Sequence, residues 1–303
     1  MPFLSRIAVI GPTAIDLVGG LGLAGNVVSR TAGMAWRSHG REVAETDVGG
    51  LVKPTCAIAP FHASHAGHAG AVGQARHVLA VTPSIIVADT TCTDCLSGGT
   101  VSVIEGAVRI VAIGRPPLAS CLDLILAVGM ALGVPDRGGA LHQHRVARML
   151  ALRMHVARYL VRTSGARRPV VIAARSDGGE WRVHDDVRAH EVVDAGGGMT
   201  AGTPGALLDP ATVQALRPDI ILAGTDGRDT GDTVSRARAI GLYRGVTDAQ
   251  SWHADWDALL GSSGPFVVDA VEAAIRATLP AALGANGTPP RPDLLKRITP
   301  GDD

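Results

Sequence analysis

The segment VTPSIIVAD at residues 81–89 has a counterpart in LRPDIILAG at residues 216–224. In each segment a proline stands two residues before an apolar run, which ends in a small or acidic residue. Such a run, bounded by turn-forming residues, is typical of a buried strand. Pro83 and Pro218 lie 135 residues apart. The repeat therefore predicts two similar α/β units, each with a mostly parallel sheet.

The opening of each half of the chain follows a second shared pattern. RIAVIG at residues 6–11 is a short apolar run that stops at Gly-Pro, and RRPVVIAARSDGG at residues 167–179 has the same form. Between the halves, residues 139–162 lack proline and internal glycine, which predicts one helix of about 24 residues and about 36 Å. Its five arginines alternate with Ala, Leu and Met, which favours a solvent-exposed basic stripe.

These patterns predict three parts along the chain. They are an N-terminal α/β lobe at residues 1–138, a connecting helix at 139–165 and a C-terminal α/β lobe at 166–303. In open α/β sheets, ligands bind beyond the carboxyl ends of the strands. We therefore expect the ligand in a cleft between the two lobes, lined by the turns that follow the strands.

Composition limits the classes of function. Of 303 residues, 28 are Lys or Arg and 28 are Asp or Glu, so the formal net charge at pH 7 is zero. This balance gives no electrostatic argument for a nucleic-acid partner or an anionic membrane. No apolar run reaches the 18 residues of a membrane span, and the residues around Arg6 do not form a signal peptide. We expect either a cytosolic protein or one whose leader has been removed.

Several motifs occur in the order found in one family of binding proteins. They are RIAVIGPTAIDLVGGLGLAGNVVSRTAG (6–33), ETDVGG (45–50), HVLAVTPSIIVAD (77–89), VIAARSDGGEWRV (171–183), DAGGGMTAG (194–202) and ALRPDIILAG (215–224). Together they resemble the substrate-binding proteins of ABC importers for haem, iron complexes or cobalamin. The closing segment at residues 247–275 is similar to the haem-binding branch. This resemblance implies two Rossmann-like lobes joined by a single long helix.

The sequence departs from the family pattern at functional positions. In many haem-binding members a Tyr follows the Val-Gly of the first lobe and ligates iron, whereas Gly50 stands here. An Arg suited to a propionate commonly follows the closing Gly-Pro, and here that residue is Phe266. The carboxylates that dock the permease align with Arg76 and Ala211. The docking carboxylates of the family are therefore absent from the expected positions.

The resemblance implies a protein that is not an enzyme and that delivers haem or another iron complex to a membrane ABC permease. It also implies a periplasmic or lipid-anchored extracytoplasmic location. The candidate ligand-binding residues are Thr13, Thr31, Gly50, Lys53, Thr90, Arg175, Met199, Thr225 and Tyr243. Lys53 and Arg175 are the best suited to a carboxylate, because both are cationic donors at expected loop ends.

Histidines and cysteines add a possible metal site. FHASHAGHAG at residues 61–70 places His62, His65 and His68 at intervals of three. Neutral imidazoles bind zinc, copper, nickel or haem iron, so one of these histidines would replace the missing Tyr as the iron ligand. A solvated His-rich loop without a ligand is the alternative. Cys92 and Cys95 form a C-x-x-C pair, which suits a disulfide, a redox couple or half of a metal site.

Two other functions compete with the haem hypothesis. The first is a divalent-metal-binding protein that holds zinc through the His-rich loop. The second is a relative of the ribokinase-like sugar kinases, which residues 8–18 also resemble. Those kinases need an Asp after their glycines as the base for the sugar hydroxyl. Here Met199 and Thr200 follow the three glycines at 196–198, so the base is missing.

Overall fold

The computed structural model describes most of both predicted lobes. The described residues are 6–31, 45–46, 82–89, 100–105, 108–114, 116–163, 167–177, 180–225, 250–261, 265–283 and 294–297. The chain divides into two compact units, Met1–Val146 with Ser262–Phe266 and Ala147–Gly261 with Val267–Asp303. The division falls inside α5 (Pro135–Arg162), a helix of 28 residues where sequence predicted a connecting helix at 139–165.

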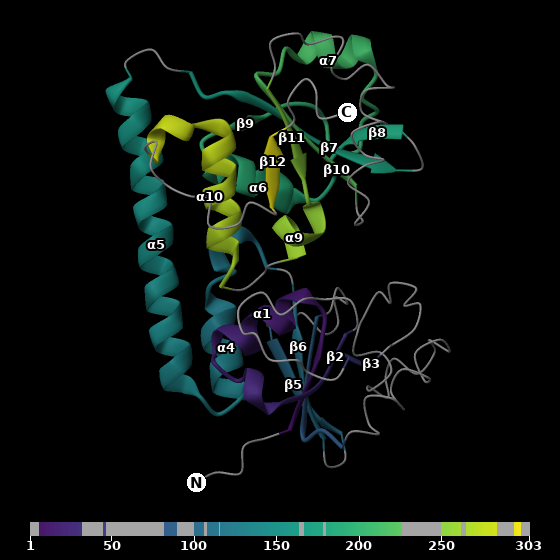
Figure 1. Cartoon of the computed structure of the whole chain (residues 1–303), viewed down its shortest axis with the longest axis vertical. Helices are drawn as coiled ribbons and strands as arrows, with labels where there is room; N and C mark the ends of the chain where they lie inside the picture. Colours follow the sequence, from purple (N-terminus) through teal and green to yellow (C-terminus); the bar gives the residue numbers. More distant parts are fainter. Residues whose placement is uncertain are drawn as a thin grey trace. The chain divides into compact units, whose positions relative to one another are not determined.

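A six-stranded sheet forms the centre of the first unit (Figure 1). Its strands lie in the order β3 (Glu45–Thr46), β2 (Val27–Thr31), β1 (Ile7–Ile10), β4 (Ile85–Asp89), β6 (Val108–Ile113) and β5 (Thr100–Glu105). Only β5 runs antiparallel to its neighbour among these strands. The described helical elements of the unit are α1 (Pro12–Gly20), η1 (Ala24–Asn26), η4 (Leu118–Ser120), α4 (Asp123–Ala131) and the first part of α5.

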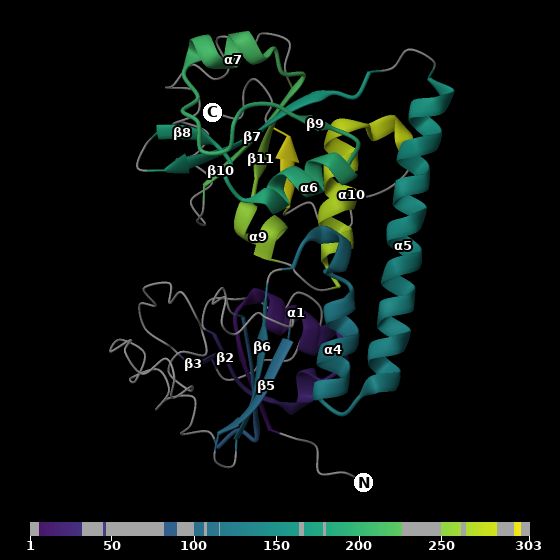
Figure 2. The ribbon, with the colours of Figure 1, turned by 180° about the vertical axis from the view of Figure 1, so that it is seen from behind.

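The central strands of this sheet are buried on both faces. Ile86, Val87 and Ala88 of β4 have no exposed surface, and Ile7, Ala8 and Val9 of β1 are nearly as enclosed. Helices α1 and α4 pack beside the sheet (Figure 2). Parallel strands covered in this way are expected to be continuously apolar rather than alternating. This is why the apolar runs at residues 6–11 and 81–89 identified strands correctly.

The second unit holds another sheet of six strands (Figure 1). Their order is β12 (Leu295–Arg297), β11 (Gln250–Ala254), β10 (Ile220–Thr225), β7 (Val170–Asp177) and β8 (Glu180–Val183), while β9 (Met199–Thr200) also pairs with β7. Strands β8 and β12 are antiparallel and the other pairs are parallel. Among the described residues, the helices are α6 (Val187–Ala195), α7 (Pro210–Leu216), α9 (Trp256–Gly261), α10 (Val267–Thr278) and η5 (Pro280–Ala282), with the rest of α5.

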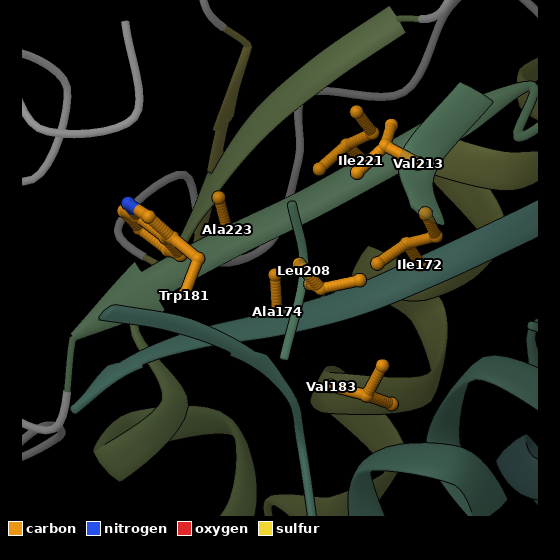
Figure 3. Close-up of a cluster of buried hydrophobic side chains, with 8 residues drawn as sticks. All are labelled: Ile172, Ala174, Trp181, Val183, Leu208, Val213, Ile221 and Ala223. Atoms are coloured by element: carbon orange, nitrogen blue, oxygen red, sulfur yellow. The ribbon is translucent and has the colours of Figure 1, made fainter. Parts of the chain in front are cut away.

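One face of the second sheet carries a compact hydrophobic cluster (Figure 3). Its members are Ile172, Ala174, Trp181, Val183, Leu208, Val213, Ile221 and Ala223. Alternate residues of β7, β8 and β10 point to this face, because side chains alternate along a strand. Val213 brings α7 onto the cluster, and Asp209 caps that helix by accepting a hydrogen bond from the Thr212 amide at 2.7 Å.

The internal repeat extends to backbone detail. Thr82 and Arg217, which precede the two equivalent prolines, have φ angles of 47° and 45°. One residue after each proline, a side chain accepts a hydrogen bond from the amide that leads into the neighbouring strand. Ser84 Oγ accepts from Arg6 at 3.0 Å, and Asp219 Oδ2 accepts from Val170 at 2.7 Å. The predicted fold class, two similar α/β units with mostly parallel sheets and a long helix, is confirmed.

The second half of α5 is fixed to α10 by charge and by packing. Arg148 Nη1 lies 3.0 Å from Asp269 Oδ1, and the same guanidinium donates to Glu272, which also accepts from Arg276 at 2.9 Å. Met149, Leu152 and Val156 are buried along the same side of the helix. Figures 1 and 2 both show this half of α5 beside α10. None of the described helices is long and apolar enough to cross a bilayer.

Candidate functional site

Parallel pairing in the first unit brings the turns after β1 and β4 together. Ile10 is in register with Ala88, so Gly11 follows β1 beside Asp89, the last residue of β4. Thr31 ends β2, the next strand along the sheet. Gly11, Thr13, Thr31 and Asp89 therefore lie at the carboxyl edge, where ligands bind in open α/β sheets.

The carboxylate of Asp89 caps α1. Thr13 N donates to Oδ2 and Ala14 N donates to Oδ1, each at 2.9 Å. Gly11 has a φ of 100°, and a Cβ added there would lie 2.5 Å from Asp89 Oδ2. A helix N-terminus attracts anions through its unpaired amides and its dipole, but Asp89 already meets that demand. Thr13 is buried and its amide is committed to Asp89, so it serves the fold at this edge.

At the carboxyl edge of the second unit, the register brings Arg175 and Thr225 together. Arg175 pairs with Gly224, and Ser176 with Thr225. The Arg175 side chain is 23% exposed, and its Nη2 donates to Asp185 Oδ2 at 3.0 Å. A guanidinium can form two parallel hydrogen bonds with a carboxylate. Arg175 is therefore a partly exposed cation, paired with Asp185, at the position where a ligand carboxylate is expected.

A tryptophan that the sequence interpretation did not single out closes this edge. Trp256 is buried at the start of α9, and its Nε1 donates to the Ala174 carbonyl at 2.8 Å. A Cβ on Gly224 would lie 2.0 Å from the Ala254 carbonyl oxygen and 2.7 Å from Trp256 Cδ1. Glycine is thus required for the indole to pack over the end of β10. The sequence signal was present, since Trp256 comes two residues after a strand.

His184 and Arg188 hold Trp256 and the rest of α9 in place at this edge of the sheet. The His184 ring contacts Trp256 edge to face with 4.8 Å between centroids, and its Nδ1 accepts from the Asp186 amide at 3.1 Å. Because Nδ1 accepts, the ring proton is assigned to Nε2. Buried Arg188 donates to the Leu260 carbonyl at 3.1 Å and so ties α6 to α9. These contacts give the Arg175 edge a rigid support.

Met199 does not lie with the other candidates of this unit. It pairs with Val170, the first residue of β7, so it is at the amino end of the strand whose carboxyl end carries Arg175. The glycines that precede Met199 pack closely against neighbouring elements. A Cβ on Gly196 would lie 2.7 Å from Ala274 Cβ, and Thr278 Oγ1 donates to the Gly196 carbonyl at 2.6 Å. Gly196 is therefore required for close packing against α10.

The remaining predicted site residues either end a strand or lie outside the described part of the chain. Thr31 and Thr225 end their strands as expected. The residues that lie outside the described part of the chain are Gly50, Lys53, His62, His65, His68, Thr90, Cys92, Cys95 and Tyr243. Across the residues that the structure does describe, no three His, Cys, Asp or Glu side chains gather as metal ligands.

Sequence comparison gives no relatives, whereas structural comparison gives many. No protein-family model matches the chain, and no curated protein matches its sequence. A periplasmic haem-binding protein from Pseudomonas aeruginosa is similar with a TM-score of 0.67 and 19% identity over 98% of this chain and 99% of that one. The apo haem-binding protein RhuT from Roseiflexus sp. RS-1 gives 0.62 and 18% identity over 92% and 99%.

A third similar structure is the periplasmic haem-binding protein BhuT in complex with two haems. It gives a TM-score of 0.62 and 19% identity over 90% of this chain and 97% of that chain. An ABC transporter substrate-binding protein from Listeria monocytogenes matches with 0.57 and 12% identity over 91% and 99%. The chain thus has the fold of two-lobed periplasmic binding proteins over almost its full length.

Proposed function

We propose that this protein is the substrate-binding component of an ABC importer and that its ligand is haem or another iron complex. The observation that carries the proposal is the similarity of fold, over 98% of this chain, to a periplasmic haem-binding protein. That similarity extends through both units. Delivery of the ligand to a membrane permease, from an extracytoplasmic location, is part of the same proposal.

Arg175 is the residue that we propose for a carboxylate of the ligand. It lies at the carboxyl edge of the second sheet, is partly exposed and is paired with Asp185. Haem carries two propionates, and a guanidinium binds a carboxylate with two charge-assisted hydrogen bonds. Lys53 is proposed for the same role on sequence grounds alone.

The iron ligand that we propose is one of His62, His65 and His68. The position where haem-binding members commonly have a Tyr is Gly50, so another side chain must supply the axial ligand. These imidazoles lie 12 to 18 residues further along the chain. The identity of the axial ligand strongly influences the properties of haem, so imidazole and phenolate ligation give different absorption spectra.

A haem titration followed by absorbance tests the proposal. We expect a Soret band typical of nitrogen ligation, and loss of that band when all three histidines are changed to Ala. The control changes His142, His144 and His155 of α5 to Ala, which removes the same number of imidazoles from a described helix. Haem binding that survives in the first variant would contradict the His assignment and leave the binding function intact.

A native mass spectrum of protein purified from cells tests the function itself. Retained haem or another iron complex supports the proposal. Retained zinc, together with no Soret shift on adding haem, would overturn it in favour of a metal-ion binding protein. The same spectrum of the triple His variant distinguishes the two, because loss of zinc and loss of haem produce different mass changes.

A further inference from the structure

Helix α5 concentrates positive charge in a chain whose net charge is zero. Its sequence contains six arginines, at positions 137, 145, 148, 153, 158 and 162, and its single acidic residue is Asp136 in the first turn. A charge distribution this uneven creates a local positive potential that the whole-chain balance hides. The second half of the helix, from residue 147 onward, belongs entirely to the second unit.

The two sides of this half of α5 have different roles. Toward α10, Met149, Leu152 and Val156 are buried and Arg148 is paired with acidic residues. On the other side, Leu150 is 54% exposed, Met154 is 50% exposed and Val161 is 80% exposed. Large apolar side chains that are this exposed and aligned on one helix are typical of an interaction surface.

These three residues form a narrow stripe. At 100° per residue, Leu150, Met154 and Val161 fall within about 40° of one another around the helix axis. Arg153, Arg158 and Arg162 are also exposed and flank the stripe. We call these six residues the outer stripe of α5. An apolar stripe bordered by arginines is the pattern of a helix that lies in the interface of an anionic membrane.

Near the C-terminal end of α5, Ala157, Arg158, Val161 and Arg162 lie along an open depression in the surface. It combines two guanidinium groups with two apolar side chains. A phospholipid offers a matching combination, since its phosphate is an anion and its glycerol and acyl carbons are apolar. Arginine suits this task because its guanidinium binds phosphate while its stem covers apolar surface.

We infer that the outer stripe of α5 binds the surface of a bilayer that contains anionic phospholipids. A second copy of this chain fits less well. A symmetric contact through the outer stripe would place Arg153, Arg158 and Arg162 of one copy close to the same arginines of the other, and like charges repel. The attraction to an anionic surface acts on all three arginines at once. It is reversible, because a few exposed apolar side chains bury too little surface for permanent anchoring. The inference does not depend on which ligand the protein carries.

Cosedimentation with vesicles tests this inference on the whole chain. We expect binding to vesicles of phosphatidylcholine with phosphatidylglycerol, weak binding to phosphatidylcholine alone, and release in high salt because exposed charges are screened. Changing Arg153, Arg158 and Arg162 to Gln should weaken binding at least about tenfold. Changing Leu150, Met154 and Val161 to Ser should weaken binding at equal charge.

Two matched controls separate the outer stripe from general surface effects. Met130, Val187 and Leu207 are also exposed apolar residues, but they lie outside α5. Their change to Ser should leave vesicle binding unaltered. Arg109 of β6 and the loop residues Arg167 and Arg217 are also exposed, and their change to Gln removes the same net charge. This variant should bind within about twofold of the unaltered protein, since screening confines the attraction to charges near the surface.

Three outcomes would overturn the inference. One is equal binding to neutral and anionic vesicles, and another is an equal loss in the control variants. The third is no vesicle binding together with salt-sensitive binding to polyglutamate, which would indicate an acidic protein partner instead. Circular dichroism and urea unfolding of each variant verify that a loss of binding is not a loss of folding.

Discussion

Asp89 and Thr13 lie 76 residues apart in the chain, and the Asp89 carboxylate accepts the Thr13 amide hydrogen at 2.9 Å. The second carboxylate oxygen accepts from Ala14, so one side chain closes the first turn of α1 from the end of the neighbouring strand. The contact fixes the β1 to α1 turn against β4. It also makes the first-lobe edge acidic, which disfavours a ligand anion at this helix.

Replacing Asp89 by Ala should lower the free energy of unfolding by about 3 kcal/mol, because two amides lose a charged acceptor. Asp89→Asn should cost about half as much, since its amide group retains one acceptor oxygen. Urea unfolding measures both. Asp123→Ala is the control, because that carboxylate also lies in the first turn of a helix but is largely exposed. A loss of less than about 1 kcal/mol is expected there.

Gly224 and Gly139 should respond in opposite directions to alanine. At Gly224 the new Cβ would lie 2.0 Å from the Ala254 carbonyl oxygen, so β10 must move away from both Ala254 and Trp256. A loss of about 3 kcal/mol or more is expected. At Gly139, inside α5, a Cβ meets nothing within 4 Å, and helix propensity predicts a gain of up to about 1 kcal/mol. Equal effects in urea unfolding would contradict the packing of Trp256 over β10.

The fold was predictable because its information is local and repeated. Apolar runs beside Pro83 and Pro218 identify the central strands, and the uninterrupted stretch at 139–162 identifies the long helix. Each of these depends on residues that are neighbours in sequence. Parallel strands need crossover connections, which are usually helices, so strands that alternate with helices are expected along the chain.

The site was less predictable because it depends on register. Nothing near residues 196–200 indicates that Met199 pairs with Val170 at the amino end of β7, far from Arg175. The contact that requires glycine at position 196 comes from Ala274, far along the chain, so no local pattern reveals it. Whole-chain charge was similarly uninformative, because the balance of 28 and 28 conceals the arginines of α5.

Protonation of Glu272 should lower the stability of the fold in acid. Burial raises the pKa of this carboxyl, but hydrogen bonds from Arg148 and Arg276 and their positive charges outweigh burial and hold the pKa below its ordinary value. A carboxyl with a lowered pKa in the folded state stabilises the fold above its unfolded pKa of about 4.3, and this contribution is lost as pH falls through the folded value.

We therefore expect the urea midpoint to decrease as pH falls below about 4.5, and Glu272→Gln to flatten that dependence. At pH 7 the same variant should be less stable by about 2 kcal/mol, because it weakens the attachment of α5 to α10. Glu180→Gln is the control, since it removes an exposed pair with Arg182 and should change stability by less than about 1 kcal/mol. An unchanged acid slope in Glu272→Gln would assign the acid sensitivity to other carboxyls.

Arg175 and Asp185 provide a test of ligand binding that separates charge from shape. If Arg175 binds a ligand carboxylate, then Asp185 competes for the same guanidinium across the 3.0 Å contact. Arg175→Gln should weaken haem binding about tenfold, because charge-assisted hydrogen bonds are lost. Asp185→Asn should strengthen it a few-fold, because the Asp185 carboxylate no longer competes for the guanidinium.

Haem dimethyl ester, which lacks free carboxylates, supplies the control ligand. Both variants should bind it as the unaltered protein does, because this ligand presents no carboxylate to Arg175 or Asp185. Glu180→Gln removes an equal negative charge next to Arg182 on the adjacent strand and should change haem affinity by less than about twofold. If Asp185→Asn weakens haem binding as much as Arg175→Gln does, Asp185 acts by holding the guanidinium in place. In that case Asp185 would aid carboxylate binding by positioning Arg175, rather than oppose it by competing for the guanidinium.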